Sequence, residues 1–233
     1  MMHPLSFPAL DTGVARVRMD VERVDLGAPE ARGRGGGVQV GWPLWSAIWE
    51  LDAIDRRSAD LWRAFITRLR GRQRLFMAGD PARALPRSAP FGFAGMLRAG
   101  GGAFPGSALT WAQAIDGDGN ATITLTGLPA AFALSAGDYV GWKWDAAGAG
   151  AGSYGRRAMA RVVVDATANG AGSASVLIEP VIDTRVVPAG AVAHLDTPMA
   201  LFRQVPGDAA TGLIGAGGAM SGSRLVAVQE LWA

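Results

Sequence analysis

The sequence predicts a mainly β protein: a β-sandwich with one flanking α-helix and an inserted small β-barrel. Three observations predict this class. Short segments of alternating apolar and polar residues recur along the chain, one segment has helical periodicity, and glycine-rich turns separate the later segments. The chain has 233 residues, 49% of them apolar, which suffices for one large or two small globular domains.

The composition argues against several classes of function. The absence of cysteine excludes disulfide scaffolds, thiolate zinc sites, iron–sulfur clusters and cysteine nucleophiles. The net charge is only +2, so bulk charge does not favour nucleic-acid binding. The cations are 21 arginines and one lysine, a ratio typical of protein interfaces and equally of a GC-rich genome. We expect neither a secretion signal nor a membrane span, since no suitable apolar run occurs.

The first segments alternate as strands do. Residues 14–24 place Val17, Met19 and Val21 between charged residues, which predicts a half-buried strand. Residues 27–37 are so rich in glycine that we expect an exposed, mobile loop. Residues 38–51 are again extended, with Trp45, Ala47, Trp49 and Leu51 on one face, and Pro43 is expected to mark a bulge or a change of strand partner.

One helix is expected next. Asp55 or Ser58 can cap it, Gly71 can end it, and its apolar stripe consists of Leu61, Trp62, Phe65, Ile66 and Leu69, with Arg56, Arg63, Arg68 and Arg70 largely off the stripe. A short strand at 73–77 and a proline-rich passage follow, and three glycines at 100–102 come after them. We place a domain boundary in this passage. The predicted sandwich domain therefore comprises residues 1–95 with 197–233, and the barrel domain comprises residues 96–196.

Short strand-like segments separated by glycine turns, in the later part of the chain, predict the barrel. Six short strands are expected at 111–115, 122–126, 139–144, 157–164, 173–179 and 191–195. Residues 116–120 predict a hairpin turn and residues 146–152 a flexible tip. Strands at 199–205 and 224–232, around a glycine-rich loop at 207–222, are expected to rejoin the first sheet, because the 38–77 unit has too few strands to cover its helix and sheet alone.

Residues capable of chemistry are scattered. Asp116, Asp118 and Asn120 begin like a calcium loop, but Ala121 and Gly127 stand where that loop needs glycine and glutamate, so a hairpin turn is favoured. His194 and Asp196 lie on the same strand face and are only weak candidates for a catalytic histidine–carboxylate pair. His3 has no such candidate partner near it in the sequence. No glycine cluster precedes Lys-Ser/Thr as in a phosphate-binding loop. We therefore predict no catalytic, cofactor or metal-binding residue.

Tryptophans are the remaining candidates. Trp42, Trp45, Trp49 and Trp62 have core spacing. Trp142 and Trp144 share one strand face beside Tyr139, so these three residues are candidates for a glycan or subunit contact, although barrel core is the favoured interpretation.

Residues 38–87 are similar to a known family. The aromatic strand and helix, followed by Leu69-Arg-Gly-Arg72, Leu75-Phe-Met77 and Gly79-Asp80-Pro81, resemble the amino-terminal region of distal tail proteins and related minor tail proteins of long-tailed, siphovirus-like bacteriophages. The second domain of many such proteins is similar to four later segments of this chain: residues 136–139 and 157–165, Ile178-Glu-Pro180 and Leu195-Asp-Thr-Pro198. The C-terminal end of those proteins is similar to residues 225–230.

This resemblance implies a structural virion protein and not an enzyme. It implies a tail-tube-like β-sandwich subunit of a homo-oligomeric, usually hexameric ring in the baseplate at the tail tip, made in the host cytoplasm. The implied partners are the tail tube protein and the hub or tail-tip proteins that carry receptor binding. DNA would pass through the lumen without specific binding, and neither a cofactor nor a membrane is implied. The alternatives are a carbohydrate-binding module of a tail tip, using Trp142, Trp144 and Trp111, and a cell-wall hydrolase using His194.

Overall fold

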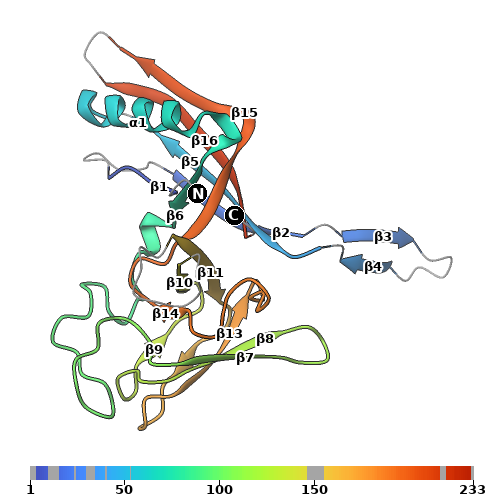
Figure 1. Cartoon of the computed structure of the whole chain (residues 1–233), viewed down its shortest axis with the longest axis vertical. Coiled ribbons are helices and arrows are strands. Elements are labelled where there is room, and N and C mark those ends of the chain that lie inside the picture. Colours follow the sequence, from blue (N-terminus) through green and yellow to red (C-terminus); the bar gives the residue numbers. More distant parts are fainter. Residues whose placement is uncertain are drawn as a thin grey trace.

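The computed structural model describes residues 4–9, 16–23, 25–29, 35–39, 41–52, 54–145, 155–215 and 219–231. The protein is mainly β, as predicted, and its described strands form two six-stranded sheets and two two-stranded ribbons. Figure 1 shows one sheet in the upper half of the molecule, with the helix against it, and the curled second sheet below.

The first sheet joins strands from both ends of the chain. Its order is β1 (Leu5–Ser6), β6 (Leu75–Ala78), β15 (Ala200–Ile214), β16 (Met220–Gln229), β5 (Leu44–Leu51) and β2 (Arg16–Glu22). The strands β15 and β16 lie between β6 and β5, so the expectation that the last strands rejoin the first sheet is confirmed. Trp45, Ala47, Trp49 and Leu51 are all buried on one face of β5, as the alternation predicted.

Helix α1 (Arg56–Leu69) covers part of this buried face. The carboxylate of Asp55 caps the helix by accepting hydrogen bonds from the backbone N of Ser58 at 3.0 Å and from its hydroxyl at 2.7 Å. The helix ends at Leu69, and its C-cap Arg70 has a left-handed φ of 49°, just before the predicted stop at Gly71. The short 3-10 helix η1 (Gly71–Gln73) then leads into β6.

Aromatic rings join the helix to the sheet. Phe7, which follows β1, lies 5.4–6.4 Å, centroid to centroid, from the rings of Trp49, Trp62, Phe65 and Phe76. Each such pair adds about 0.5–1.5 kcal/mol beyond the area that it buries. The prediction that Leu61 belongs to the buried apolar stripe of the helix is wrong. Leu61 is 43% exposed, because the stripe that packs on the sheet is narrower than predicted.

The second sheet contains the six strands that were predicted for the barrel. Its order is β14 (Val192–His194), β10 (Tyr139–Trp144), β11 (Arg156–Val162), β13 (Ala174–Glu179), β8 (Ala121–Leu125) and β7 (Trp111–Ile115). The sheet curls into a half-barrel. The segment before β7 returns to β14, because Ser107 bridges His194 and the backbone N of Ala108 donates to Ala193 O at 2.9 Å. A ribbon of β9 (Ala133–Leu134) and β12 (Ala166–Thr167) lies beside it.

Strands β10 and β11 are buried on both faces. Val140 and Trp142 point into the half-barrel core, whereas Tyr139 and Met159 belong to the core of the first sheet. The burial alternates in this way because neighbouring side chains of a strand point to opposite faces. One pair of strands therefore serves two cores.

Arg161 of β11 connects the two sheets. Its guanidinium donates to Met19 O of β2 at 2.6 Å and to the Tyr139 hydroxyl at 2.9 Å. It lies 5.1 Å from the ring centroid of Trp45 and 5.3 Å from that of Tyr139. The indole N–H of Trp45 donates to Met159 O at 2.7 Å across the same junction. The hydrogen bonds from Arg161 to Met19 O and from Trp45 to Met159 O, together with the contact of Arg161 with the Trp45 ring, therefore hold the two sheets together.

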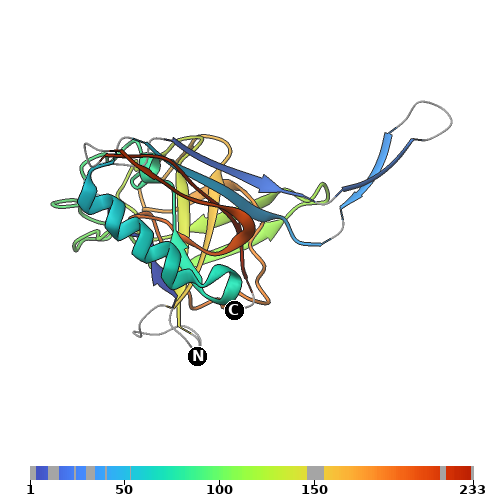
Figure 2. The same ribbon diagram turned by 90° about the horizontal axis from the view of Figure 1, so that it is seen from above.

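Two predicted glycine-rich loops are largely strand. Within residues 27–37, β3 (Asp25–Pro29) and β4 (Gly35–Gln39) pair as a ribbon that extends away from the body in Figures 1 and 2. Within residues 207–222, β15 continues to Ile214 and β16 starts at Met220, with a register shift between Gln204 and Ala209. Ladder hydrogen bonds use the backbone, so glycine does not prevent this pairing. The predicted tip at 146–152 lies outside the described residues.

The strand partners change at Pro43, as expected, because β4 pairs with β3 and β5 pairs with β2 and β16. The domain boundaries at residues 95/96 and 196/197 stay predictions. Ala89 and Phe93, which the predicted boundary assigns to the sandwich domain, pack in the core of the half-barrel.

We predict that Arg161→Ala lowers the free energy of unfolding by roughly 2 kcal/mol, because it removes two hydrogen bonds and two cation–π contacts. Urea unfolding followed by tryptophan fluorescence measures this change. Arg16→Ala is the matched control, since Arg16 has an 84% exposed side chain and lies 3.9 Å from Glu50. Equal effects of the two substitutions would contradict the role given to Arg161.

Candidate functional site

The three aromatic residues considered for glycan or subunit contact are buried. Tyr139 is 4% exposed, Trp142 0% and Trp144 5%. Trp142 and Trp144 belong to the half-barrel core, where the ring of Trp111 meets that of Trp142 edge to face at 5.5 Å. Stacking on a sugar needs an open ring face. The glycan-platform interpretation is therefore corrected, and these two tryptophans form barrel core, the interpretation that the sequence favoured.

Tyr139 is part of the junction between the sheets. Its hydroxyl accepts a hydrogen bond from Arg161 at 2.9 Å and lies 3.5 Å from the carboxylate of Asp80. Burial raises the pKa of Tyr139 above its usual value, and the hydrogen bond from Arg161 acts in the opposite direction. The hydroxyl is thus a structural hydrogen-bonding group.

His194 is a core histidine. Its Nδ1 lies 2.8 Å from the backbone O of Asp196, and the carboxylate of Asp196 is instead 3.0 Å from the Thr197 hydroxyl. Burial first, and the charge of Lys143 next, lower the pKa of His194 to about 4, so the ring is neutral near pH 7. The catalytic pair considered for His194 and Asp196 does not form in this geometry. His3 lies outside the described residues.

The turn at 116–120 is a hairpin turn, as predicted. The carboxylate of Asp116 accepts hydrogen bonds from the backbone N of Asp118 at 2.9 Å and of Asn120 at 2.8 Å, and from the side-chain amide of Asn120 at 2.8 Å. These bonds lower the pKa of Asp116, the side-chain bond from Asn120 contributing most. Across the described ranges, no group of three or more His, Cys, Asp or Glu side chains is placed to hold a metal ion.

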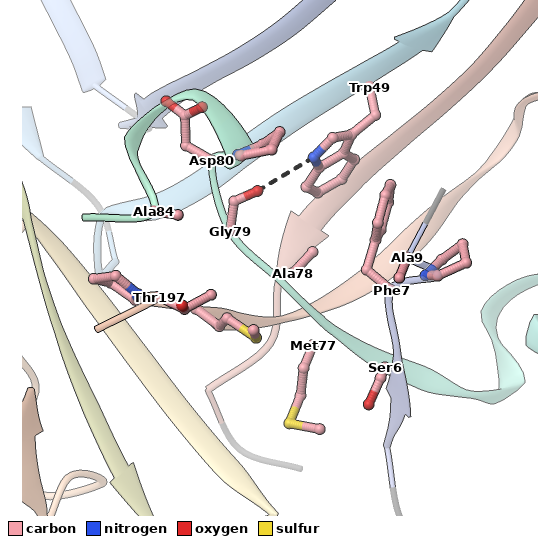
Figure 3. A pocket seen from close by; sticks show the side chains of 14 residues that line it. Ser6, Phe7, Ala9, Trp49, Met77, Ala78, Gly79, Asp80, Ala84 and Thr197 are labelled. Carbon is pink, nitrogen blue, oxygen red and sulfur yellow. Dashed lines mark hydrogen bonds between the residues drawn. The ribbon is translucent and has the colours of Figure 1, made fainter. Parts of the chain in front are cut away.

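A cavity of about 300 Å³ is a candidate site that the sequence did not indicate (Figure 3). It lies beside β1 and β6, where the chain passes between the two sheets. Four segments line it: residues 6–9, Trp49, residues 77–81 with Ala84, and residues 197–199. No local sequence motif predicts this cavity, because the segments that line it are far apart in the sequence and come together only in the folded chain.

The lining of this cavity is mainly apolar. The indole N–H of Trp49 points to Gly79 O at 3.4 Å, and Asp80 caps the 3-10 helix η2 (Pro81–Arg83) by accepting from the backbone N of Ala82 at 2.9 Å. Figure 3 shows the Asp80 carboxylate turned away from the rings of Trp49 and Phe7. Because these polar groups are engaged, the cavity suits an apolar side chain or a small apolar ligand.

Close backbone contact shapes one wall. Thr197 has a φ of 48°, which is strained for a β-branched residue, and its backbone N donates to Ala84 O at 2.7 Å. Beside it, a Cβ added at Gly79 would lie 2.2 Å from Pro198 O. The two connections between the sheets therefore touch here. In the part of the chain that the structure describes, no helix has the length and apolar character to cross a membrane.

We predict that Gly79→Ala destabilises the protein by roughly 2–3 kcal/mol, because the new methyl group forces the connections apart. Thermal unfolding by differential scanning calorimetry measures the loss. Gly100→Ala is the matched control, since a Cβ at Gly100 meets nothing within 4 Å. A tolerated Gly79→Ala would contradict the close approach.

His194 predicts a pH dependence of stability. Its pKa is about 4 in the folded protein and about 6.5 when exposed, so the unfolded chain binds more protons between these values. Stability falls as the pH drops below about 6.5, and the loss is complete near pH 4 at roughly 3 kcal/mol. His194→Asn keeps a side-chain donor near Asp196 O but cannot titrate, so urea unfolding at pH 7 and pH 4.5 should differ less than in the wild type. An unchanged difference would refute this assignment.

Comparison of the sequence with models of known protein families finds no match, and neither does comparison with curated proteins.

Proposed function

We propose that this chain is a structural protein of a bacteriophage virion, a subunit of the ring that links the tail tube to the tail tip. In this proposal about six copies surround a channel through which DNA passes without specific binding. The tube protein lies on one side and the hub and receptor-binding proteins lie on the other. The resemblance of residues 38–87 to distal tail proteins suggests the family, and the shape of the chain supports the role.

The observation that carries the proposal is a well-packed body from which β-ribbons project. In Figure 1 the ribbons β3–β4 and β7–β8 extend toward the right of the molecule, and the outer part of β15–β16 extends toward the upper left. Two of them expose apolar side chains, Leu213 being 82% exposed and Ile115 53%. Ring formation needs two different surfaces that meet on neighbouring copies, and projecting ribbons supply such surfaces.

The alternatives are less well supported. A carbohydrate-binding module would have used Trp142 and Trp144, which are buried, and Trp111, which packs against Trp142. A cell-wall hydrolase would have relied on His194, which is buried and bonded to a backbone carbonyl. Neither alternative retains the residues on which it was based, whereas the ring proposal does not depend on an exposed reactive group.

The oligomeric state tests the proposal. Mass photometry of the purified chain, alone and with the tube protein of the same phage, should detect a particle of about six times the 24.1 kDa subunit mass. The same samples should show no change in tryptophan fluorescence with soluble glycans. Monomers under both conditions would contradict the ring.

A further inference from the structure

Positive charge concentrates on helix α1 and the turn after it. Residues 55–74 hold seven arginines and two aspartates, a net charge of +5, whereas the whole chain carries +2, so the remainder carries −3. The arginines are Arg56, Arg57, Arg63, Arg68, Arg70, Arg72 and Arg74. We infer that the outward face of α1 binds the tip of the β7–β8 hairpin of a second copy of this chain. This inference rests on the proposed ring and assigns one of its contacts.

The outward face of α1 is a mixed surface. Arg57, Leu61 and Arg68 follow one another at spacings of four and seven residues, which places them along one side of the helix. Leu61 is 43% exposed, and with Arg56, Arg57 and Asp60 it lines a shallow hollow. Arginine is enriched at protein interfaces, and the exposed leucine between two arginines adds an apolar contact to this face.

Four arginines of α1 and of the turn after it form no salt bridge with the described residues. In the part of the chain that the structure describes, the guanidinium groups of Arg56, Arg68, Arg70 and Arg72 form no salt bridge. The neighbouring Asp55 is occupied as the helix cap. Among the described residues, the charges of these four arginines are therefore not paired by salt bridges.

The tip of the β7–β8 hairpin has the complementary character. Residues 111–125 contain two aspartates, Asp116 and Asp118, and no cation. Ile115, beside them, is 53% exposed, so the tip offers an apolar side chain next to negative charge. The turn is held by the hydrogen bonds to Asp116, which present Asp118 in a fixed geometry.

The two surfaces are suitably placed for a head-to-tail contact. In Figure 1, α1 lies at the upper left and the β7–β8 tip at the lower right of the molecule. A contact between different surfaces of neighbouring copies repeats from copy to copy and closes into a ring when the rotation permits. Charge complementarity would orient the copies and speed their association.

Charge exchange tests this contact. Arg68→Glu alone, and Asp118→Arg alone, each place like charges at the contact, and the concentration for half-assembly should rise about tenfold or more in mass photometry. The double variant Arg68→Glu with Asp118→Arg restores opposite charges, as does an equimolar mixture of the two single variants. Both should assemble within about threefold of the wild type. Arg87→Glu is the control, since it makes the same charge change at an exposed position elsewhere.

The outcomes separate the two proposals. If wild-type rings form and both single variants assemble as Arg87→Glu does, the contact is refuted and the ring stands. If the single variants fail and the mixture does not recover, α1 meets a different partner, and the inference is again refuted. A wild-type chain that never assembles refutes the ring itself. Thermal unfolding of each variant shows that a loss of assembly is not a loss of fold. Binding of DNA that Arg68→Glu abolishes would also overturn the assignment.

Discussion

The guanidinium of Arg161 determines how the two sheets meet. It lies against the rings of both Trp45 and Tyr139, which also contact each other, and it donates to the backbone of β2, so it contacts both sheets at once. A cation in such a position is satisfied only when both sheets are present in the correct orientation. The rest of the architecture depends on this contact, because β10 and β11 contribute to one core on each of their faces.

This junction has a consequence for assembly. A body with two linked cores can present projecting ribbons in fixed directions, whereas two loosely tethered domains could not. Chemistry-bearing groups are used in the same construction: Asp55 and Asp80 cap helices, Asp116 closes a turn, and His194 packs as a neutral ring. These polar side chains therefore stabilise helix ends, a turn and the core, whereas arginines and the projecting ribbons lie on the surface.

The sequence predicted the parts of the fold that depend on local patterns. Alternation placed Trp45 and Trp49 on one buried face, and turn chemistry located the hairpin at Asp116, because both signals lie within a few residues. It did not predict the pairing of β3 with β4, since backbone ladders form without apolar side chains. The cavity beside Phe7 and Thr197 was also missed, because distant segments build it and no motif encodes their meeting.

Electron microscopy of the chain assembled with its tube protein tests the central claim most directly. We expect annular particles in which copies surround an open channel, with α1 of each subunit against the next one. Class averages that contain only compact single subunits, with no central opening, would contradict the account.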